Sequence, residues 1–209
     1  MEQLAPHTLL KLKSKTSLVD SAALSIWASA MLAKAPYVIV RRGKQDKQVP
    51  VGIRGFLKNQ RFASFIKFNE WSETITPAQA LTFLPNVSPA RMQLAAFKKL
   101  KEIFPLLQKY EWGVSGSLQF EMVTGLQVVT SQSDIDIIMS CTKNITKDNA
   151  NKLLKRLAEI RPGTHVDVQV VHGQNGFSLE EFVQHRSDKI LVKTQNGPVL
   201  AEDPWNFLK

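Results

Sequence analysis

The sequence predicts an α+β protein built on a mixed sheet with flanking helices. Apolar residues recur at helical spacing in segments such as 148–160. By contrast, Tyr37 to Val40 and Val166 to Val171 are short aliphatic runs rich in β-branched residues, as in buried strands. Asn196-Gly197 separates two more apolar runs and indicates a hairpin turn. Because helices alternate with both single strands and hairpins, the sheet should be mixed rather than purely parallel.

Residues 1–85 are expected to form a smaller α+β domain. Its elements should be, in order, an extended stretch from Leu9 to Leu18, a helix capped by Asp20 or Ser21 and running to Lys34, strands from Tyr37 to Val40 and Val49 to Phe56, and an extended segment from Arg61 to Ile66. Thr76-Pro77 marks the start of a further helix, because proline favours the first helical position. Asn86 to Pro89 is turn-like, so the domain boundary is expected there.

Residues 86–209 are expected to form the larger, catalytic domain. Its elements should be, in order, a helix from Ser88 or Pro89 to Phe104, a turn from Gly113 to Ser117, a hairpin of Leu118 to Met122 and Val128 to Thr130 around Thr124-Gly125, a strand from Asp134 to Met139, a helix from Asp148 to Ile160, a strand from Val166 to Val171, a short helix ending at Arg186, and a hairpin from Ile190 to Leu200.

Composition narrows the function classes. The chain has 209 residues, one cysteine and a formal net charge of +9. No stretch is long and apolar enough to cross a bilayer, no secretory signal is recognisable at the start, and the lone Cys141 suits a reducing compartment, so a cytoplasmic location is expected. Residues 1–85 hold 12 lysines and arginines against 5 acidic residues, whereas residues 86–209 hold 15 against 13. An anionic partner is therefore expected, and the positive charge of the N-terminal half should attract it.

Three acidic residues are the strongest candidates for chemistry. Side chains alternate along a strand, so Asp134 and Asp136 should share one face, about 7 Å apart. Asp167 lies between core-facing valines and should project towards that pair. Carboxylates gathered in this way can hold two hard cations that clamp an in-line displacement at phosphorus. The alternative for each residue is a half-exposed strand with a solvated acidic face.

Gly116-Ser117 precedes these acids and is expected at a turn. Successive backbone N–H groups at a turn can cradle a phosphate, and a glycine allows close approach. Ser117 adds a hydroxyl. Gly-Ser, then Asp-x-Asp, then a third Asp on another strand together favour metal-assisted nucleotidyl transfer.

Several segments carry a resemblance to a known family. They are Pro50 to Gly55, Asn59 to Ala63, Trp112 to Ser117, Phe120 to Gly125, Ser133 to Asp136, Val166 to Gln169 and Asp203 to Trp205. Together they resemble the malonate decarboxylase holo-acyl-carrier-protein synthases, also called phosphoribosyl-dephospho-CoA transferases, over nearly the whole chain. Two departures are Val114-Ser115 in place of Pro-Thr, and a longer gap between Ser117 and Asp134, which a hairpin around Gly125 could absorb.

The resemblance implies a polymerase-beta-like nucleotidyltransferase fold and a defined reaction. The phosphoribosyl-dephospho-CoA group would pass from 2'-(5''-triphosphoribosyl)-3'-dephospho-CoA to a serine of the acyl-carrier protein of malonate decarboxylase, with release of pyrophosphate. Asp134, Asp136 and Asp167 would hold Mg²⁺, with Mn²⁺ as an alternative, and Asp167 could also act as the base. The donor phosphates would lie on Gly116 and Ser117.

Arg54 and Arg61 are candidates for phosphate binding, because guanidinium groups contact phosphates in bidentate fashion. A structural ion pair is the competing interpretation for each. Other function classes stay open. The chain could be a nucleotidyltransferase with another protein, small-molecule or nucleic-acid acceptor, or a silent module that keeps the fold. Nucleic-acid binding is disfavoured, because no helix-turn-helix, aromatic RNA-binding signature or dense basic stripe occurs.

Overall fold

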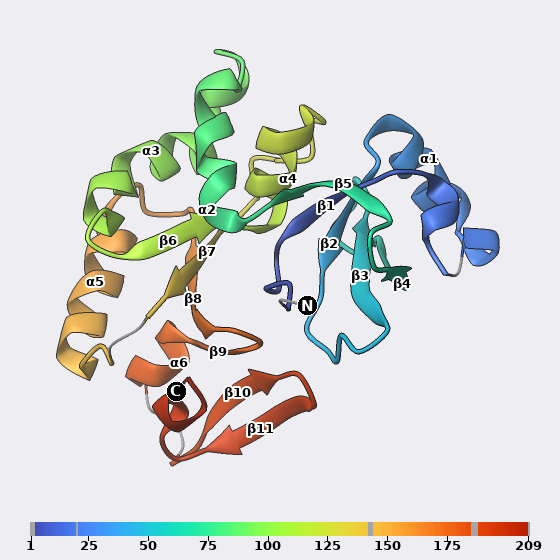
Figure 1. Ribbon diagram of the computed structural model, residues 1–209. Helices are drawn as coiled ribbons and strands as arrows, with labels where there is room; N and C mark the ends of the chain where they lie inside the picture. The colour runs from blue at the N-terminus through green and yellow to red at the C-terminus, as the bar shows by residue number, and fades with distance from the viewer. Residues whose placement is uncertain (1–2, 20, 142–143, 185–187, 209) are drawn as a thin grey trace. The chain divides into compact units, whose positions relative to one another are not determined.

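The computed structural model describes residues 3–19, 21–141, 144–184 and 188–208. The chain divides into two compact units, Met1–Thr76 and Pro77–Lys209 (Figure 1). The division falls before the short helix α2 (Pro77–Ala80), rather than after residue 85 as expected. The reason is close packing, because Gly113 lies against the backbone of Pro77 and Ala78, and any side chain at position 113 would collide with it.

In its described residues, the N-terminal unit is one antiparallel sheet with one α-helix on its face. Its described elements are β1 (Leu9–Leu12), α1 (Ile26–Lys34), β2 (Tyr37–Val40), β3 (Gln48–Arg54), β4 (Arg61–Lys67) and β5 (Trp71–Ile75). Within the described residues the strand order is β4-β3-β2-β1-β5. Alternate strand residues such as Val38, Val40 and Val51 pack on Ala28 and Leu32 of α1, which forms the core of this unit.

Several N-terminal expectations are corrected in detail. Extended backbone ends at Leu12 and a 3-10 turn follows, because Ser14 accepts the backbone N–H of Thr16 and starts it. Helix α1 begins after Ser25, whose hydroxyl accepts the N–H of Ala28. Asp20, considered as a cap, lies outside the described residues. Strand β5 has no counterpart among the expected elements.

The C-terminal unit is a mixed sheet with helices packed beside it (Figure 1). Its described elements after α2 are α3 (Ala95–Leu107), β6 (Glu111–Val114), α4 (Gly116–Thr124), β7 (Ile135–Ser140), α5 (Lys147–Glu159), β8 (Val166–His172), β9 (Asn175–Ser178), α6 (Leu179–Gln184), β10 (Ile190–Thr194) and β11 (Gly197–Ala201). The described strand order is β11-β10-β9-β8-β7-β6. Strands β7 and β8 are parallel, joined by α5, while their outer partners run antiparallel. The fold is therefore α+β, as expected.

The largest correction lies between residues 116 and 125. The expected hairpin is a helix, α4, whose end is the left-handed Gly125 with φ of 72°. Left-handed glycine is a usual helix stop, which explains the Thr124-Gly125 pair that had indicated a turn. The helix before it also starts later than expected, since Arg91–Gln93 forms a 3-10 turn and α3 begins at Ala95. Strands β6 and β9 were not expected. The end expected at Arg186 lies outside the described residues.

Aromatic side chains consolidate the C-terminal end of this unit. Trp205 stacks edge-on against Phe177 and Phe182, with ring centroids 5.1 and 5.7 Å away. Asp203 starts the short turn that carries Trp205 by accepting its backbone N–H at 3.0 Å. Asp203 to Trp205 thus serves packing. No helix in the described part of the chain is long and apolar enough to cross a membrane.

Candidate functional site

Two of the three predicted aspartates lie side by side. Asp136 on β7 and Asp167 on β8 are register partners in the parallel ladder. Their neighbours in each strand, such as Ile135 and Val168, are buried in the core. Side chains alternate between the two faces, so both carboxylates leave the sheet on the same face, opposite the buried aliphatic residues.

The third aspartate is placed differently from the expectation. Strand β7 begins at Ile135, whose backbone N–H bonds the carbonyl of His165 at 2.9 Å. Asp134 therefore lies one residue before the strand, where alternation no longer fixes its direction. In the described residues no group of three or more His, Cys, Asp or Glu side chains is arranged to hold a metal ion. The backbone thus brings Asp136 and Asp167 together, while the full three-carboxylate set is not assembled as one group.

Gly116 and Ser117 form the first residues of helix α4 rather than a free turn. Ser115 precedes the helix, is buried, and donates its backbone N–H to the carbonyl of Asp136 at 2.8 Å. The first N–H groups of a helix lack intrahelical partners and carry its positive end. The predicted phosphate cradle is therefore a helix N-terminus at the edge of β7, a well-suited place for a phosphate group.

Position 116 requires a glycine for two reasons, its backbone conformation and its close contact with Asp136. Its φ of +67° lies in the left-handed region. A methyl group built on Gly116 would collide with the carboxylate of Asp136, since Oδ2 and Cγ are the nearest atoms. Asp136 therefore lies directly against the first turn of α4. Gly116 of the Gly-Ser motif and Asp136 of β7 are thus in contact.

Arg54 and Arg61 belong to the N-terminal unit. They are register partners on β3 and β4. Arg54 is 6% exposed and its Nε lies 3.5 Å from the Gly55 carbonyl, whereas Arg61 is exposed and donates to the Gln60 carbonyl at 3.1 Å. Of the two, Arg61 is the side chain that an external anion can reach.

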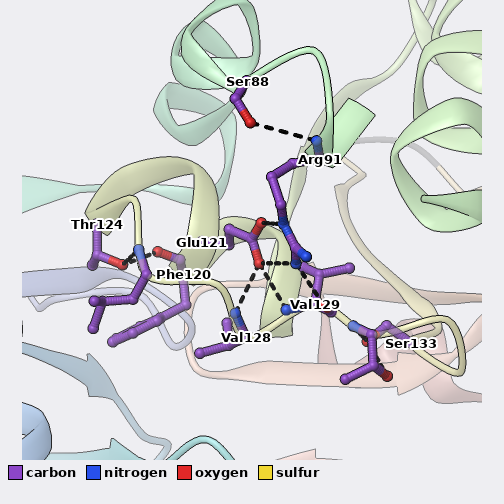
Figure 2. A network of polar contacts seen from close by, with 10 residues as sticks. Ser88, Arg91, Phe120, Glu121, Thr124, Val128, Val129 and Ser133 are labelled. Atoms are coloured by element: carbon purple, nitrogen blue, oxygen red, sulfur yellow. Dashed lines mark hydrogen bonds and ion pairs between the residues drawn. The ribbon is translucent and has the colours of Figure 1, made fainter. Parts of the chain in front are cut away.

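Sequence reasoning missed a partly buried ion pair in the same unit, between Arg91 and Glu121. Glu121 of α4 is 4% exposed and accepts both Nε and Nη2 of Arg91, at 2.6 and 2.9 Å (Figure 2). The same carboxylate accepts the backbone N–H groups of Val128 and Val129 at 2.8 and 2.7 Å. Glu121 lies in the segment from Phe120 to Gly125 that carries the family resemblance, but no local sequence signal links it to Arg91, 30 residues earlier in the chain.

Two titratable groups with shifted pKa values lie near the central strands, the buried Lys99 and the partly buried Cys141. Lys99 of α3 is 1% exposed and donates to the Thr164 carbonyl at 2.6 Å, which anchors the segment before β8. Burial lowers the pKa of Lys99 below its ordinary 10.5. Burial, and then the charge of Glu111, raise the pKa of the Cys141 thiol. A raised pKa disfavours the thiolate, which is the nucleophilic form of the Cys141 side chain.

A cavity of about 530 Å³ lies between α5, α6 and the segment before β8. Its described lining includes Lys99, Leu157, His165 and Val166 but none of the three aspartates. Val166 faces the core side of β8, opposite Asp167. The cavity is therefore on the other face of the sheet from the carboxylate pair.

The C-terminal unit thus places a carboxylate pair beside a helix N-terminus, an arrangement that suits enzymes acting on phosphate groups. Comparison with known families specifies the class. Residues 83–204 match the phosphoribosyl-dephospho-CoA transferase MdcG C-terminal domain, and residues 5–77 match the N-terminal domain of the same proteins. The chain belongs to the phosphoribosyl-dephospho-CoA transferase family, which is a family of transferase enzymes.

Individual relatives agree with this assignment. The chain is 30% identical over 205 residues to a phosphoribosyl-dephospho-CoA transferase of Pseudomonas syringae pv. tomato, covering 97% of this chain and 93% of the relative. It is 32% identical over 183 residues to one of Pseudomonas fluorescens strain Pf0-1, covering 86% and 85%. It is 28% identical over 207 residues to one of Klebsiella pneumoniae strain 342, covering 96% of each. No solved structure matches the chain.

Proposed function

We propose that this protein transfers the phosphoribosyl-dephospho-CoA group from 2'-(5''-triphosphoribosyl)-3'-dephospho-CoA to a serine of the acyl-carrier subunit of malonate decarboxylase, releasing pyrophosphate. Family membership supports the transferred group. The observation that carries the chemistry is the position of Asp136, register partner of Asp167 and in contact with Gly116 at the start of α4. Donor phosphates bound at the start of α4 would lie beside both the backbone N–H groups of the helix and the two carboxylates.

Helix α4 provides the phosphate site in this proposal. Backbone N–H groups at Gly116 and Ser117 bind the outer phosphates, with the positive end of the helix dipole behind them. The Ser117 hydroxyl donates to a phosphate oxygen. Because the left-handed Gly116 has no side chain, the Asp136 carboxylate lies against the first turn of α4, so the carboxylate and the helix N-terminus can act on the same phosphate group.

Magnesium is part of the proposal, with manganese as an alternative. Asp136 and Asp167 fit a hard divalent cation in donor chemistry, because carboxylate oxygens are its preferred ligands. Asp134, which precedes β7, would complete the set. When bound, the metal would neutralise phosphate charge and polarise the phosphorus being attacked. That chemistry suits a reaction in which positioning and charge neutralisation dominate.

The group transfer balances without a redox partner. The carrier serine oxygen forms a bond to the phosphorus of the phosphoribosyl group itself, the innermost of the three in the donor, and the bond from that phosphorus to the pyrophosphate oxygen breaks. Asp167 accepts the serine proton as general base, and pyrophosphate leaves towards the start of α4. The exposed Arg61 and the basic N-terminal unit attract the anionic donor or an acidic carrier. A cytoplasmic location is also part of this proposal, supported by the single cysteine.

Release of pyrophosphate tests the form of the reaction. The protein, the triphosphoribosyl donor and Mg²⁺ should produce pyrophosphate only when apo-carrier is added, in a one-to-one ratio with modified carrier. Equal release without carrier would show hydrolysis rather than transfer. Release with the carrier of citrate lyase but not with that of malonate decarboxylase would move the proposal to another acceptor.

A further inference from the structure

The ion pair between Arg91 and Glu121 joins three segments of the C-terminal unit. Arg91 lies in the 3-10 turn before α3, Glu121 lies in α4, and Val128 and Val129 lie in the segment leading to β7. Besides its two bonds to Glu121, Arg91 donates from Nη2 to the Val129 carbonyl at 2.6 Å. Figure 2 shows the carboxylate at the centre of these contacts. The Glu121 carboxylate therefore connects helix α4, the 3-10 turn that contains Arg91, and the segment that leads into strand β7.

Each attached segment carries part of the candidate site. Helix α4 starts at Gly116 and Ser117. The segment held at Val128 and Val129 continues to Asp134 and β7. Ser133 closes a local turn there by accepting the Thr130 N–H at 2.9 Å. The phosphate-binding end of the helix and the first acidic residue are thus tied to the same buried glutamate.

The geometry indicates that the pair is strong enough to fix these positions. Both oxygens of Glu121 are used, by two guanidinium and two backbone donors, and its side chain is 4% exposed. Bidentate, charge-assisted bonds are short and directional. Removal of a partner from a buried charge is strongly destabilising, so other positions of the segment would cost the Glu121 carboxylate its two backbone donors.

We propose that Arg91 and Glu121 are positioning residues for the transfer reaction. They set the distance between the start of α4 and the residues from Asp134 to Asp136. The proposal rests on the transfer function proposed above. Neither side chain contacts the donor phosphates or the carrier serine in the proposed reaction. Their role is to hold the segment from Val128 to Asp134 in register with the helix, because small misplacements of reacting groups cost large factors in rate.

Arg91→Lys and Glu121→Gln test this with the shape of the side chains largely kept. Lysine cannot make the two-pronged contact, and the amide of glutamine cannot accept from Arg91 at both positions. Each variant should lower kcat by about 10-fold to 100-fold while the donor KM stays within about 2-fold. Glu102→Gln is the matched control, because Glu102 makes an exposed ion pair with Arg161 at 2.5 Å and should leave kcat unchanged.

Amide hydrogen exchange separates positioning from general stability. In both variants exchange should rise in residues 126–134 and stay unchanged in β8 and β10. A rise spread evenly over the C-terminal unit, or an unchanged kcat per folded molecule, would overturn the proposal. If the wild-type protein modifies no carrier, the proposed function fails, and localised exchange at 126–134 still decides whether the pair positions this segment.

Discussion

The carboxylate of Asp136 occupies the place where a side chain of Gly116 would begin, so the first residue of α4 lies against the aspartate of β7. This contact predicts that Gly116→Ala strongly reduces transfer. The methyl group would push Asp136 away, and left-handed φ would cost about 1–2 kcal/mol. Activity should fall by about 100-fold or more. Steady-state kinetics and thermal unfolding measure the two effects.

Gly125→Ala is the matched control for that substitution. Gly125 also has left-handed φ, of 72°, but nothing lies within 4 Å of an added methyl group. It should lose a similar free energy of unfolding, about 1 kcal/mol, and keep its activity. Equal losses of activity in the two variants would show that strain, and not contact with Asp136, explains the effect at Gly116.

Asp136→Asn and Asp167→Asn should each remove transfer while the fold persists. Both side chains are only partly buried, so loss of charge should change the free energy of unfolding by less than about 1 kcal/mol. Wild-type Tm should rise when Mg²⁺ is added, and the two variants should lose that rise. Asp148→Asn, at an exposed position in the first turn of α5, should keep it. A Mg²⁺ response retained by Asp136→Asn would contradict the proposed metal site.

Lys99 should give the protein a stability that rises with pH in the alkaline range. Burial lowers the pKa of Lys99 in the folded protein, so between that value and 10.5 the unfolded chain binds more protons. Stability therefore increases as pH rises through this window. Lys99→Met should abolish the slope, and lose about 1–3 kcal/mol because the Thr164 carbonyl is left without its donor. Lys101→Met, at an exposed position, should retain the slope in chemical denaturation across pH.

Tyr37 should make the stability of the folded protein fall with rising pH, opposite to the effect of Lys99, and at higher pH. Burial, followed by its hydrogen bond to Glu73 at 2.9 Å, raises the pKa of Tyr37 from 10.0 to about 12. The unfolded chain then loses the proton first, so stability present below pH 10.0 falls as pH rises towards about 12. Tyr37→Phe should remove this fall. Denaturation at pH 9 to 12, with Tyr110→Phe as the comparison, tests whether the effect belongs to Tyr37.

The two arginines of the N-terminal unit should differ in their effects. Arg61 is exposed, so Arg61→Gln should raise the KM for donor or carrier by a few-fold at low salt and less at high salt, because exposed charges are screened. Arg54 is 6% exposed, so Arg54→Gln should lower Tm instead. Lys13→Gln, another exposed site, is the control. A salt-independent KM in Arg61→Gln would count against a binding role.

The strands and helices with simple patterns could be predicted from sequence. Val166–His172 and Lys147–Glu159 form where aliphatic alternation and helical spacing indicate them. Asp136 and Asp167 could be predicted to share a face for the same reason. Their direct pairing could not, because the register of parallel strands depends on how α5 packs across them.

Helix α4 shows why the remainder could not be predicted. A buried glutamate at position 121 disfavours a core helix until Arg91, 30 residues away in sequence, is known to neutralise it. Gly125 supports a hairpin or a helix stop equally well. Contacts distant in sequence, such as that of Glu121 with Arg91, favour the helix over the hairpin. The longer gap from Ser117 to Asp134 therefore contains helix α4 and the segment after it that Glu121 holds at Val128 and Val129, not a hairpin.

The most direct test of the account is intact-mass spectrometry of apo-carrier proteins incubated with this protein, Mg²⁺ and the triphosphoribosyl donor. The malonate decarboxylase carrier should gain the mass of one phosphoribosyl-dephospho-CoA group on a single serine. That gain should be absent with Asp136→Asn and with a carrier whose serine is alanine. An unmodified carrier with active wild-type protein, or full modification by Asp136→Asn, would contradict the account.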